Sequence, residues 1–78
     1  MIERILKCMR IAFDLEPDRV TEDTLREDID QWDSIGMMRL VLCLEEEFGV
    51  SIEPEAARRM TSCRTIAAEL RRLGVFAE

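Results

Sequence analysis

Hydrophobic positions recur at helical spacing in several segments of the chain, and no segment alternates as a β-strand would. The first segment, residues 2–15, has six such positions: Ile2, Ile5, Leu6, Met9, Ala12 and Phe13. The second segment runs from Ser34 to Phe48 and is followed by Gly49, a residue typical of helix C-caps. Its apolar stripe has i, i+3, i+4, i+7, i+11 spacing: Met37, Leu40, Val41, Leu44 and Phe48. Both segments are therefore predicted to be amphipathic helices.

The remaining sequence predicts a short helix, another long helix and a long connection. Pro54 suits the first turn of a short helix over residues 54–60. A last helix is expected to begin near Thr61 or Ser62, to fray after Gly74, and to bury Cys63, Ile66, Ala67 and Leu70. Residues 16–33 form the connection, and we expect four apolar side chains to fasten it across the helices: Val20, Leu25, Ile29 and Trp32. The predicted fold is all-α, a small antiparallel bundle of three main helices plus one short helix, in a single domain spanning residues 1–78.

Composition narrows the function classes. A chain of 78 residues buries only about 60% of its unfolded surface and has little room for a cleft around a sizeable substrate. With 47% hydrophobic and 36% charged residues, the chain is expected to be ordered. A net charge of −6 disfavours nucleic acid and anionic membranes and favours basic partner surfaces. We expect a monomer that meets its partners through protein–protein contacts.

The cysteines and carboxylates do not form a metal site pattern. Cys8, Cys43 and Cys63 are odd in number, widely spaced and unaccompanied by histidine, so they are interpreted as small core residues in a reducing, cytoplasmic setting. No signal peptide or membrane span is recognised in the sequence. The acidic run that begins at Asp28 fails as a calcium loop, because its sixth position is Asp33 and its twelfth is Arg39. No metal ligands are therefore assigned.

Ser34 is the residue with the clearest chemical potential. It stands at a predicted helix start beside Asp33, yet the chain contains no histidine that could activate it, which argues against a serine hydrolase and against an enzyme in general. Asp33 can cap the helix and leave the Ser34 hydroxyl free. Gly36 is expected to leave the space beside Ser34 uncrowded. A phosphate on Ser34 would be stabilised at the positive end of the helix dipole. The competing interpretation is that Ser34 is only a cap.

The face of the second helix opposite its apolar stripe is a candidate partner surface. Five side chains are expected to point outward there: Met38, Arg39, Leu42, Glu45 and Glu46. Exposed methionine and leucine framed by charges suit a surface that binds several partners. The alternative is that the long connection covers Met38 and Leu42. Glu45–Glu47 are interpreted as a solvated helix end.

These residues together resemble an acyl carrier protein. The likeness rests on Asp33-Ser34-Ile35, on residues 40–48, and on Val50 and Ile52. The resemblance implies that Ser34 is the covalent attachment residue for 4′-phosphopantetheine, with Asp33 beside it, and that the prosthetic thiol holds an acyl group as a thioester. It also implies that the second helix is the recognition helix. The implied partners are a phosphopantetheinyl transferase, an acyl-loading ligase or synthase, and downstream biosynthetic enzymes.

The sequence departs from the usual family pattern in ways that bear on the pathway. In the run Gln31-Trp32-Asp33-Ser34-Ile35, Gln31 stands where a glycine is usual, and Ile35 replaces leucine. Arg39 stands where carriers of fatty-acid synthesis commonly have an acidic residue, and a reversed charge on a docking face can set specificity. These departures favour a stand-alone carrier of a specialised pathway. An aminoacyl or peptidyl carrier stays open as the alternative, as does a helical interaction module with unmodified Ser34.

Overall fold

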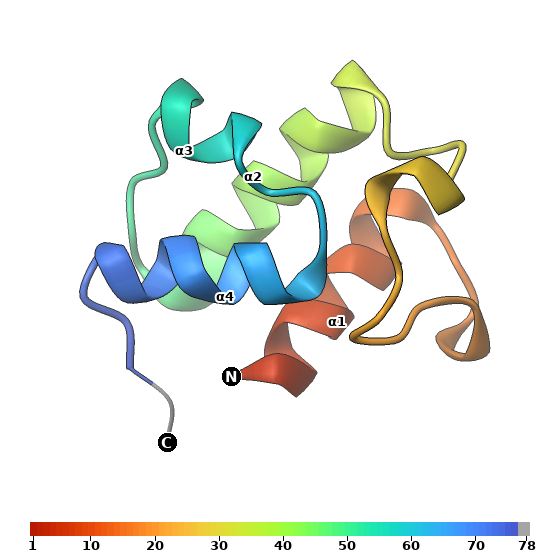
Figure 1. Ribbon diagram of the computed structural model, residues 1–78, viewed down its shortest axis with the longest axis horizontal. Coiled ribbons are helices and arrows are strands. Elements are labelled where there is room, and N and C mark those ends of the chain that lie inside the picture. Colours follow the sequence, from red (N-terminus) through yellow and green to blue (C-terminus); the bar gives the residue numbers. More distant parts are fainter. Residues whose placement is uncertain (77–78) are drawn as a thin grey trace.

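The computed structural model describes residues 1–76, and their regular elements are helices, as predicted (Figure 1). Three longer helices and one short helix follow one another along the chain: α1 (Ile2–Phe13), α2 (Ser34–Phe48), α3 (Pro54–Arg58) and α4 (Cys63–Arg72). Two single 3₁₀ turns, Pro17–Arg19 and Arg26–Asp28, interrupt the connection between α1 and α2. The all-α fold with three main helices and one short helix is therefore confirmed, although α3 ends two residues earlier than the predicted residue 60.

Helices α1 and α2 run antiparallel. The Arg4 side chain, in the first turn of α1, donates from Nε to a carboxylate oxygen of Glu47 at 2.8 Å, in the last turn of α2, and from Nη2 to the Glu47 carbonyl at 2.7 Å. Helix α1 ends at Phe13 rather than at residue 15, because Asp14 adopts a left-handed conformation (φ 54°) and closes the helix. A left-handed C-cap is a common way to satisfy the last carbonyl groups of a helix.

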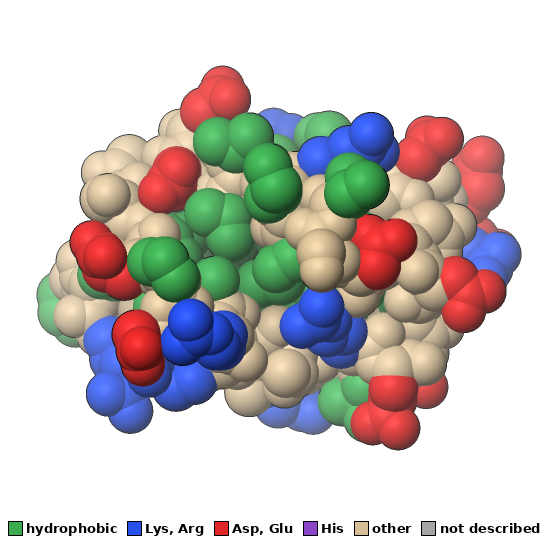
Figure 2. Space-filling view, turned by 90° about the horizontal axis from the view of Figure 1, so that it is seen from above, with side chains coloured by type: hydrophobic (Ala, Val, Ile, Leu, Met, Phe, Trp, Pro, Cys, Tyr) green, Lys and Arg blue, Asp and Glu red, His purple; other side chains and the backbone are tan. Residues whose placement is uncertain are grey.

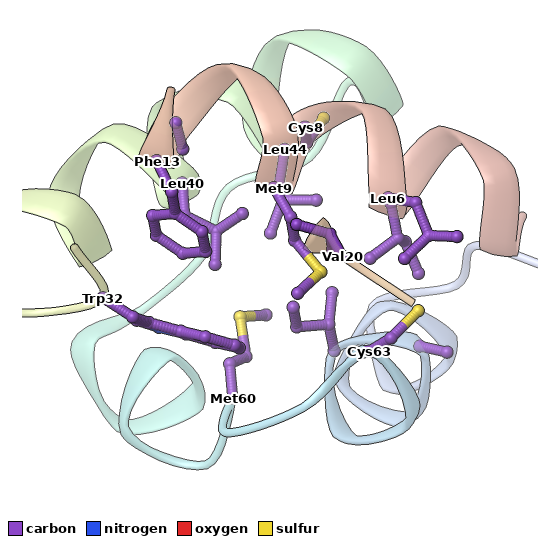
Figure 3. Close-up of a cluster of buried hydrophobic side chains, with 14 of the residues drawn as sticks. Leu6, Cys8, Met9, Phe13, Val20, Trp32, Leu40, Leu44, Met60 and Cys63 are labelled. Carbon is purple, nitrogen blue, oxygen red and sulfur yellow. The ribbon is translucent and has the colours of Figure 1, made fainter. Parts of the chain in front are cut away.

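The hydrophobic core lies where α1, α2, α4 and the connection meet. Figure 3 shows Phe13 and Met9 of α1 beside Leu40 and Leu44 of α2, Leu6 of α1 above Cys63 of α4, and Trp32 extending below Phe13 toward Met60. The Phe13 and Trp32 rings have centroids 5.0 Å apart and are tilted by 32°, a favourable aromatic geometry. The apolar faces predicted for α1 and α4 are buried, except Ile2, which is only half-buried. On α2, only Leu40 and Leu44 of the predicted stripe are fully buried, whereas Met37, Val41 and Phe48 are half-buried.

The connection between α1 and α2 is held by three of its four predicted anchors. Val20, Ile29 and Trp32 are buried, but the Leu25 side chain is 43% exposed, so its predicted role as a hydrophobic anchor is wrong. Backbone pairing fixes the chain at this point instead. Leu25 forms an isolated antiparallel bridge with Ser62, and the Arg26 amide donates to the Thr61 carbonyl at 2.8 Å. The connection is therefore tied to the start of α4 through main-chain atoms.

Helices α3 and α4 are joined by a side-chain pair that the hydrophobic pattern does not reveal. Glu69 of α4 is 5% exposed, and its two carboxylate oxygens accept from Nε and Nη2 of Arg59, each at 3.0 Å. This paired, charge-assisted contact lowers the pKa of Glu69 from its ordinary value, with the Arg59 hydrogen bonds as the main cause. Arg59 immediately follows α3, so the pair fastens this short helix to α4.

Candidate functional site

The start of α2 is capped by Asp33 and not by the neighbouring serine. Asp33 has an extended backbone, and its carboxylate accepts from the Gly36 amide at 2.9 Å. That contact satisfies one of the amide groups that a helix start leaves without an intrahelical partner. The capping role predicted for Asp33 is thereby confirmed, and Ser34 becomes the first residue inside the helix.

Ser34 is exposed, and within residues 1–76 its hydroxyl has no hydrogen-bond partner. The reason is local: Asp33 already occupies the capping position, so the Ser34 hydroxyl is not drawn back onto the backbone. An unengaged hydroxyl at the positive end of a helix can accept a covalent phosphate ester, and the helix dipole would stabilise the ester's negative charge.

Gly36 has a different role from the one predicted. It is buried, and a Cβ atom at this position would come within 1.9 Å of the Gln31 carbonyl oxygen and 3.3 Å of the Phe13 ring. Gly36 does not clear space beside Ser34, because the backbone of residue 31 fills that space. A glycine is instead required so that the connection can approach the first turn of α2 closely. The backbone immediately before Asp33 and Ser34 is thereby packed against the helix that bears them.

Trp32 fastens the segment before the site to the core. Its indole Nε1 donates to the Met37 sulfur at 3.2 Å, while its ring packs on Phe13. Its carbonyl oxygen accepts from Nε of Arg26 at 2.9 Å. Trp32 thus holds the start of α2 through its side chain and one nearby arginine through its main-chain carbonyl.

An apolar groove opens beside Ser34. It has a volume of about 470 Å³ and lies between α2, α3 and the connection, within the usual range for small-molecule sites. Figure 2 shows hydrophobic side chains gathered around a hollow on this face, with cationic side chains at its border. Ten residues line the groove: Arg26, Ser34, Met37, Met38, Val41, Leu42, Ile52, Pro54, Ala57 and Arg58. The groove can accept an extended apolar chain attached at its own edge.

The outer face of α2 is open to solvent over most of the predicted surface. Met38 and Leu42 are 66% and 57% exposed, so the long connection does not cover them. Arg39 and Glu46 are also exposed. Ile35, 63% exposed, belongs to the same face and was not among the predicted residues. Its position directly after Ser34, off the apolar stripe, is the signal that could have identified it.

Two acidic residues of α2 serve the fold more than the surface. The Glu45 carboxylate accepts from the Ile52 amide at 2.8 Å and is half-buried, so the expectation that it points freely outward is wrong. Glu47 pairs with Arg4, and Lys7 lies 3.5 Å from the same carboxylate. These contacts lower the pKa of Glu47, with the Arg4 hydrogen bond as the largest cause. Within the Glu45–Glu47 run, Glu46 is exposed, whereas Glu45 and Glu47 are half-buried.

Two of the three cysteines are fully buried, as predicted for core residues. Cys8 and Cys63 have no exposed surface, and Cys43 is half-buried. Burial, followed by contact with Cys43, raises the pKa of Cys8 to about 12, and burial also raises the pKa of Cys63 to about 11. Both thiols are therefore protonated at neutral pH and poor nucleophiles. Over residues 1–76 there is no cluster of histidine, cysteine and carboxylate side chains suited to a metal ion.

The fold and the start of α2 point to a carrier domain, and comparison with known families identifies the class. The family model described as "Phosphopantetheine attachment site" matches residues 3–73, so the chain belongs to this family of phosphopantetheine carriers. The covalent prosthetic group of the family is 4′-phosphopantetheine, as the resemblance implied.

Individual relatives agree with the family. An acyl carrier protein of Zymomonas mobilis subsp. mobilis is 36% identical over 58 residues, which make up 74% of each chain. An acyl carrier protein of Thermosynechococcus vestitus is 28% identical over 67 residues, covering 85% of this chain and 82% of the relative. No solved structure matches the chain at a significant level. Among residues 1–76, no helix has the length and apolar character needed to cross a membrane. The expected membership of the acyl carrier family is confirmed.

Proposed function

We propose that this chain is a discrete acyl carrier in which Ser34 bears 4′-phosphopantetheine, with residues 1–78 forming a single carrier domain. The observation that carries the proposal is the state of the Ser34 hydroxyl, which is exposed and has no partner among residues 1–76, because Asp33 caps α2. A phosphopantetheinyl transferase would find this hydroxyl presented on a rigid helix start. The chain itself needs no activating base, because the transferase supplies the chemistry.

The residues around Ser34 fit the prosthetic group. The amide end of α2 favours the phosphodiester charge, and the groove beside Ser34 offers apolar surface to a cargo. When bound, the group supplies a thiol that holds an acyl chain as a thioester. The protein contributes a fixed attachment point, and the tether raises the local concentration of cargo at each partner enzyme. In this role the chain is a substrate of enzymes and performs no catalysis of its own.

We assign partner docking to the open face of α2. Ile35, Met38 and Leu42 give it an apolar strip, and the exposed Arg39 and Glu46 frame the strip with charge. Glu45 stays in the proposed surface only at its edge, since its carboxylate is bound to Ile52. The expected partners are the transferase, an acyl-loading ligase or synthase and downstream enzymes with basic surfaces, in agreement with the net charge of −6.

Features of the site favour a specialised biosynthetic pathway. Gln31 replaces the glycine of the usual pattern, Trp32 is built into the core, and Arg39 gives the docking face a cation. The buried thiols of Cys8 and Cys63 are suited to a reducing compartment, for which we propose the cytoplasm. An aminoacyl or peptidyl cargo is the second candidate, and a helical interaction module with unmodified Ser34 is the third.

Intact-protein mass spectrometry tests the attachment. The apo protein is incubated with coenzyme A and each of several phosphopantetheinyl transferases. We expect one phosphopantetheine mass on the wild type and on Ser51→Ala, which removes another exposed serine, and none on Ser34→Ala. A wild type that stays unmodified with every transferase would refute the carrier proposal. A modified Ser34→Ala would refute the assigned residue.

The docking face is tested by charge reversal. Arg39→Glu should change the loading rates of different ligases and synthases in different proportions, whereas Arg71→Glu, on the exposed last turn of α4, should leave them equal to wild type. Both variants should unfold within about 0.5 kcal/mol of wild type, as is usual for surface substitutions. Unchanged loading of Arg39→Glu by all partners would refute its role.

A further inference from the structure

The groove beside Ser34 has an unusual balance of charge for this protein. The chain has 17 acidic and 11 basic residues, yet among the described residues 1–76 no carboxylate lines the groove. Its charged members are two arginines, Arg26 from the connection and Arg58 from α3, and its other polar member is Ser34 itself. An otherwise apolar groove whose two charged lining residues are both arginines differs from the acidic remainder of the molecule, and its charge favours an anionic occupant.

Arg26 is held in place by the fold. Its amide donates to the Thr61 carbonyl at 2.8 Å, and its Nε donates to the Trp32 carbonyl at 2.9 Å. The side chain is half-buried, and within residues 1–76 it pairs with no carboxylate and its two Nη groups have no acceptor. A guanidinium that is oriented through Nε and free at Nη can accept a planar, two-oxygen anion with little loss of conformational freedom.

Arg58 is available to the same groove. Its contact with Glu55, 3.2 Å from Nη1, joins two side chains that are 70% and 76% exposed. Exposed ion pairs of this kind contribute little to stability, so Arg58 can exchange Glu55 for a better-placed anion. Arg26 and Arg58 thus border an apolar channel from the two segments that flank α2.

We propose that the groove selects an acyl cargo that ends in a carboxylate, with the aliphatic part against Met37 and Val41 and the anionic oxygens on Arg26, assisted by Arg58. The inference rests on the proposed attachment at Ser34. It disfavours an aminoacyl cargo, because an ammonium group in the groove would meet two like charges and no carboxylate. The phosphodiester of the arm offers the same anionic oxygen chemistry, and the experiment separates the two sources.

The test compares four loaded forms of one protein. A phosphopantetheinyl transferase attaches the arm from coenzyme A, pentanoyl-coenzyme A, glutaryl-coenzyme A or 5-aminopentanoyl-coenzyme A. The three acyl forms share a five-carbon chain and differ in having a neutral, anionic or cationic end. Intact mass first verifies loading. If all four forms lack the added mass, the proposed function fails and this inference fails with it.

Two readouts then report where the cargo lies. The arginine Nε–Hε resonance of Arg26, assigned with Arg26→Gln, is expected to shift in the glutaryl form relative to the unacylated, pentanoyl and aminopentanoyl forms. Cleavage of the glutaryl thioester by hydroxylamine should be slowed roughly tenfold relative to the pentanoyl thioester, the scale of one charge-assisted hydrogen bond. Arg26→Gln should abolish this difference, Arg58→Gln should reduce it, and the matched control Arg71→Gln should retain it.

Other outcomes overturn the inference. Equal cleavage of glutaryl and pentanoyl thioesters in the wild type would show that the groove does not read the terminal charge. If the Arg26 Nε–Hε resonance shifts between the apo protein and the unacylated form, and shifts no further when the glutaryl group is added, the arginine binds the phosphodiester instead. If Arg26→Gln is too unstable for measurement, the exposed Arg58→Gln variant decides: a glutaryl difference unchanged from wild type would count against the proposal.

Discussion

Two helices of this protein begin beside a serine, and the structure uses the two serines in opposite ways. At the start of α4, Ser62 is the cap: its hydroxyl accepts from the Thr65 amide at 3.1 Å, and the residue is buried. At the start of α2, Asp33 is the cap and Ser34 follows it, and the Ser34 hydroxyl is exposed and has no partner in the described part of the chain. A shift of one residue relative to the cap separates a structural serine from a chemically available one.

The residue three positions after each serine also differs between the two helix starts. Ser62 and Thr65 form a reciprocal capping box, in which the Thr65 hydroxyl accepts from the Ser62 amide at 2.9 Å. Position 37, which would complete such a box for Ser34, is a methionine whose sulfur accepts a hydrogen bond from the Trp32 indole. At the start of α4 the side chains of Ser62 and Thr65 bind each other's amides, whereas at the start of α2 the serine lies at the edge of a groove.

Exchanging the two residues at the start of α2 is the strongest test of this comparison. In the double variant Asp33→Ser, Ser34→Asp, serine would occupy the cap, where it ranks as highly as aspartate, and aspartate would lie in the first turn, where the dipole favours it. We expect the double variant to fold and to gain no phosphopantetheine mass when it is incubated with a transferase. Circular dichroism and intact mass measure the two properties. Modification at the wild-type rate would show that a serine at the cap position is still available to the transferase.

Gly36→Ala should give the largest loss of stability at this helix start. The new methyl group would overlap the Gln31 carbonyl, and overpacking of this kind costs about 1–3 kcal/mol. The loss arises although alanine is intrinsically the better helix former. Urea unfolding measures the change, with Ser34→Ala as a control that alters the same turn without adding bulk. A variant as stable as wild type would mean that the connection can move away from α2.

The two caps should contribute similarly to stability, and the cap at Ser62 should have no influence on loading. Asp33→Ala and Ser62→Ala each remove a side chain that accepts a helix amide, and each should cost about 1 kcal/mol in urea unfolding. Ser62→Ala should still be modified at the wild-type rate, since its serine has no role beyond the cap. Loss of modification in a folded Ser62→Ala protein would contradict the separation of the two roles.

The Arg59–Glu69 pair should give the smallest effect on stability at neutral pH, and this effect should depend clearly on pH in acid. Because the folded-state pKa of Glu69 lies below its ordinary value of 4.5, its ionised form stabilises the fold above that pH. This contribution is lost as the pH falls through the lowered folded-state pKa. The thermal unfolding midpoints of wild type and Glu69→Gln should therefore converge in strong acid. Glu47 has a pKa shifted in the same direction, so Glu69→Gln removes only part of the acid sensitivity. A gap between the proteins that is constant with pH would contradict the assignment.

The sequence by itself determined the helices and narrowed the cap of α2 to Asp33 or Ser34, because both features depend on neighbours within one or two helical turns. Apolar spacing predicted α1, α2 and α4 to within about two residues, and the order Asp33-Ser34 favoured Asp33 as the cap of α2 while leaving Ser34 as the alternative. The start of α3 at Pro54 followed from the same local chemistry.

Only the tertiary structure decided the features that join segments far apart in the chain. Gly36 is needed because the backbone of Gln31 passes over it, and Leu25 stays exposed because main-chain pairing with Ser62 holds the connection. Glu69 is buried because Arg59 neutralises it. The groove, with Arg26 fixed by Trp32, exists only once α2, α3 and the connection are packed together. Periodicity reports which face of a helix is buried, but it carries no information on which distant atom meets that face.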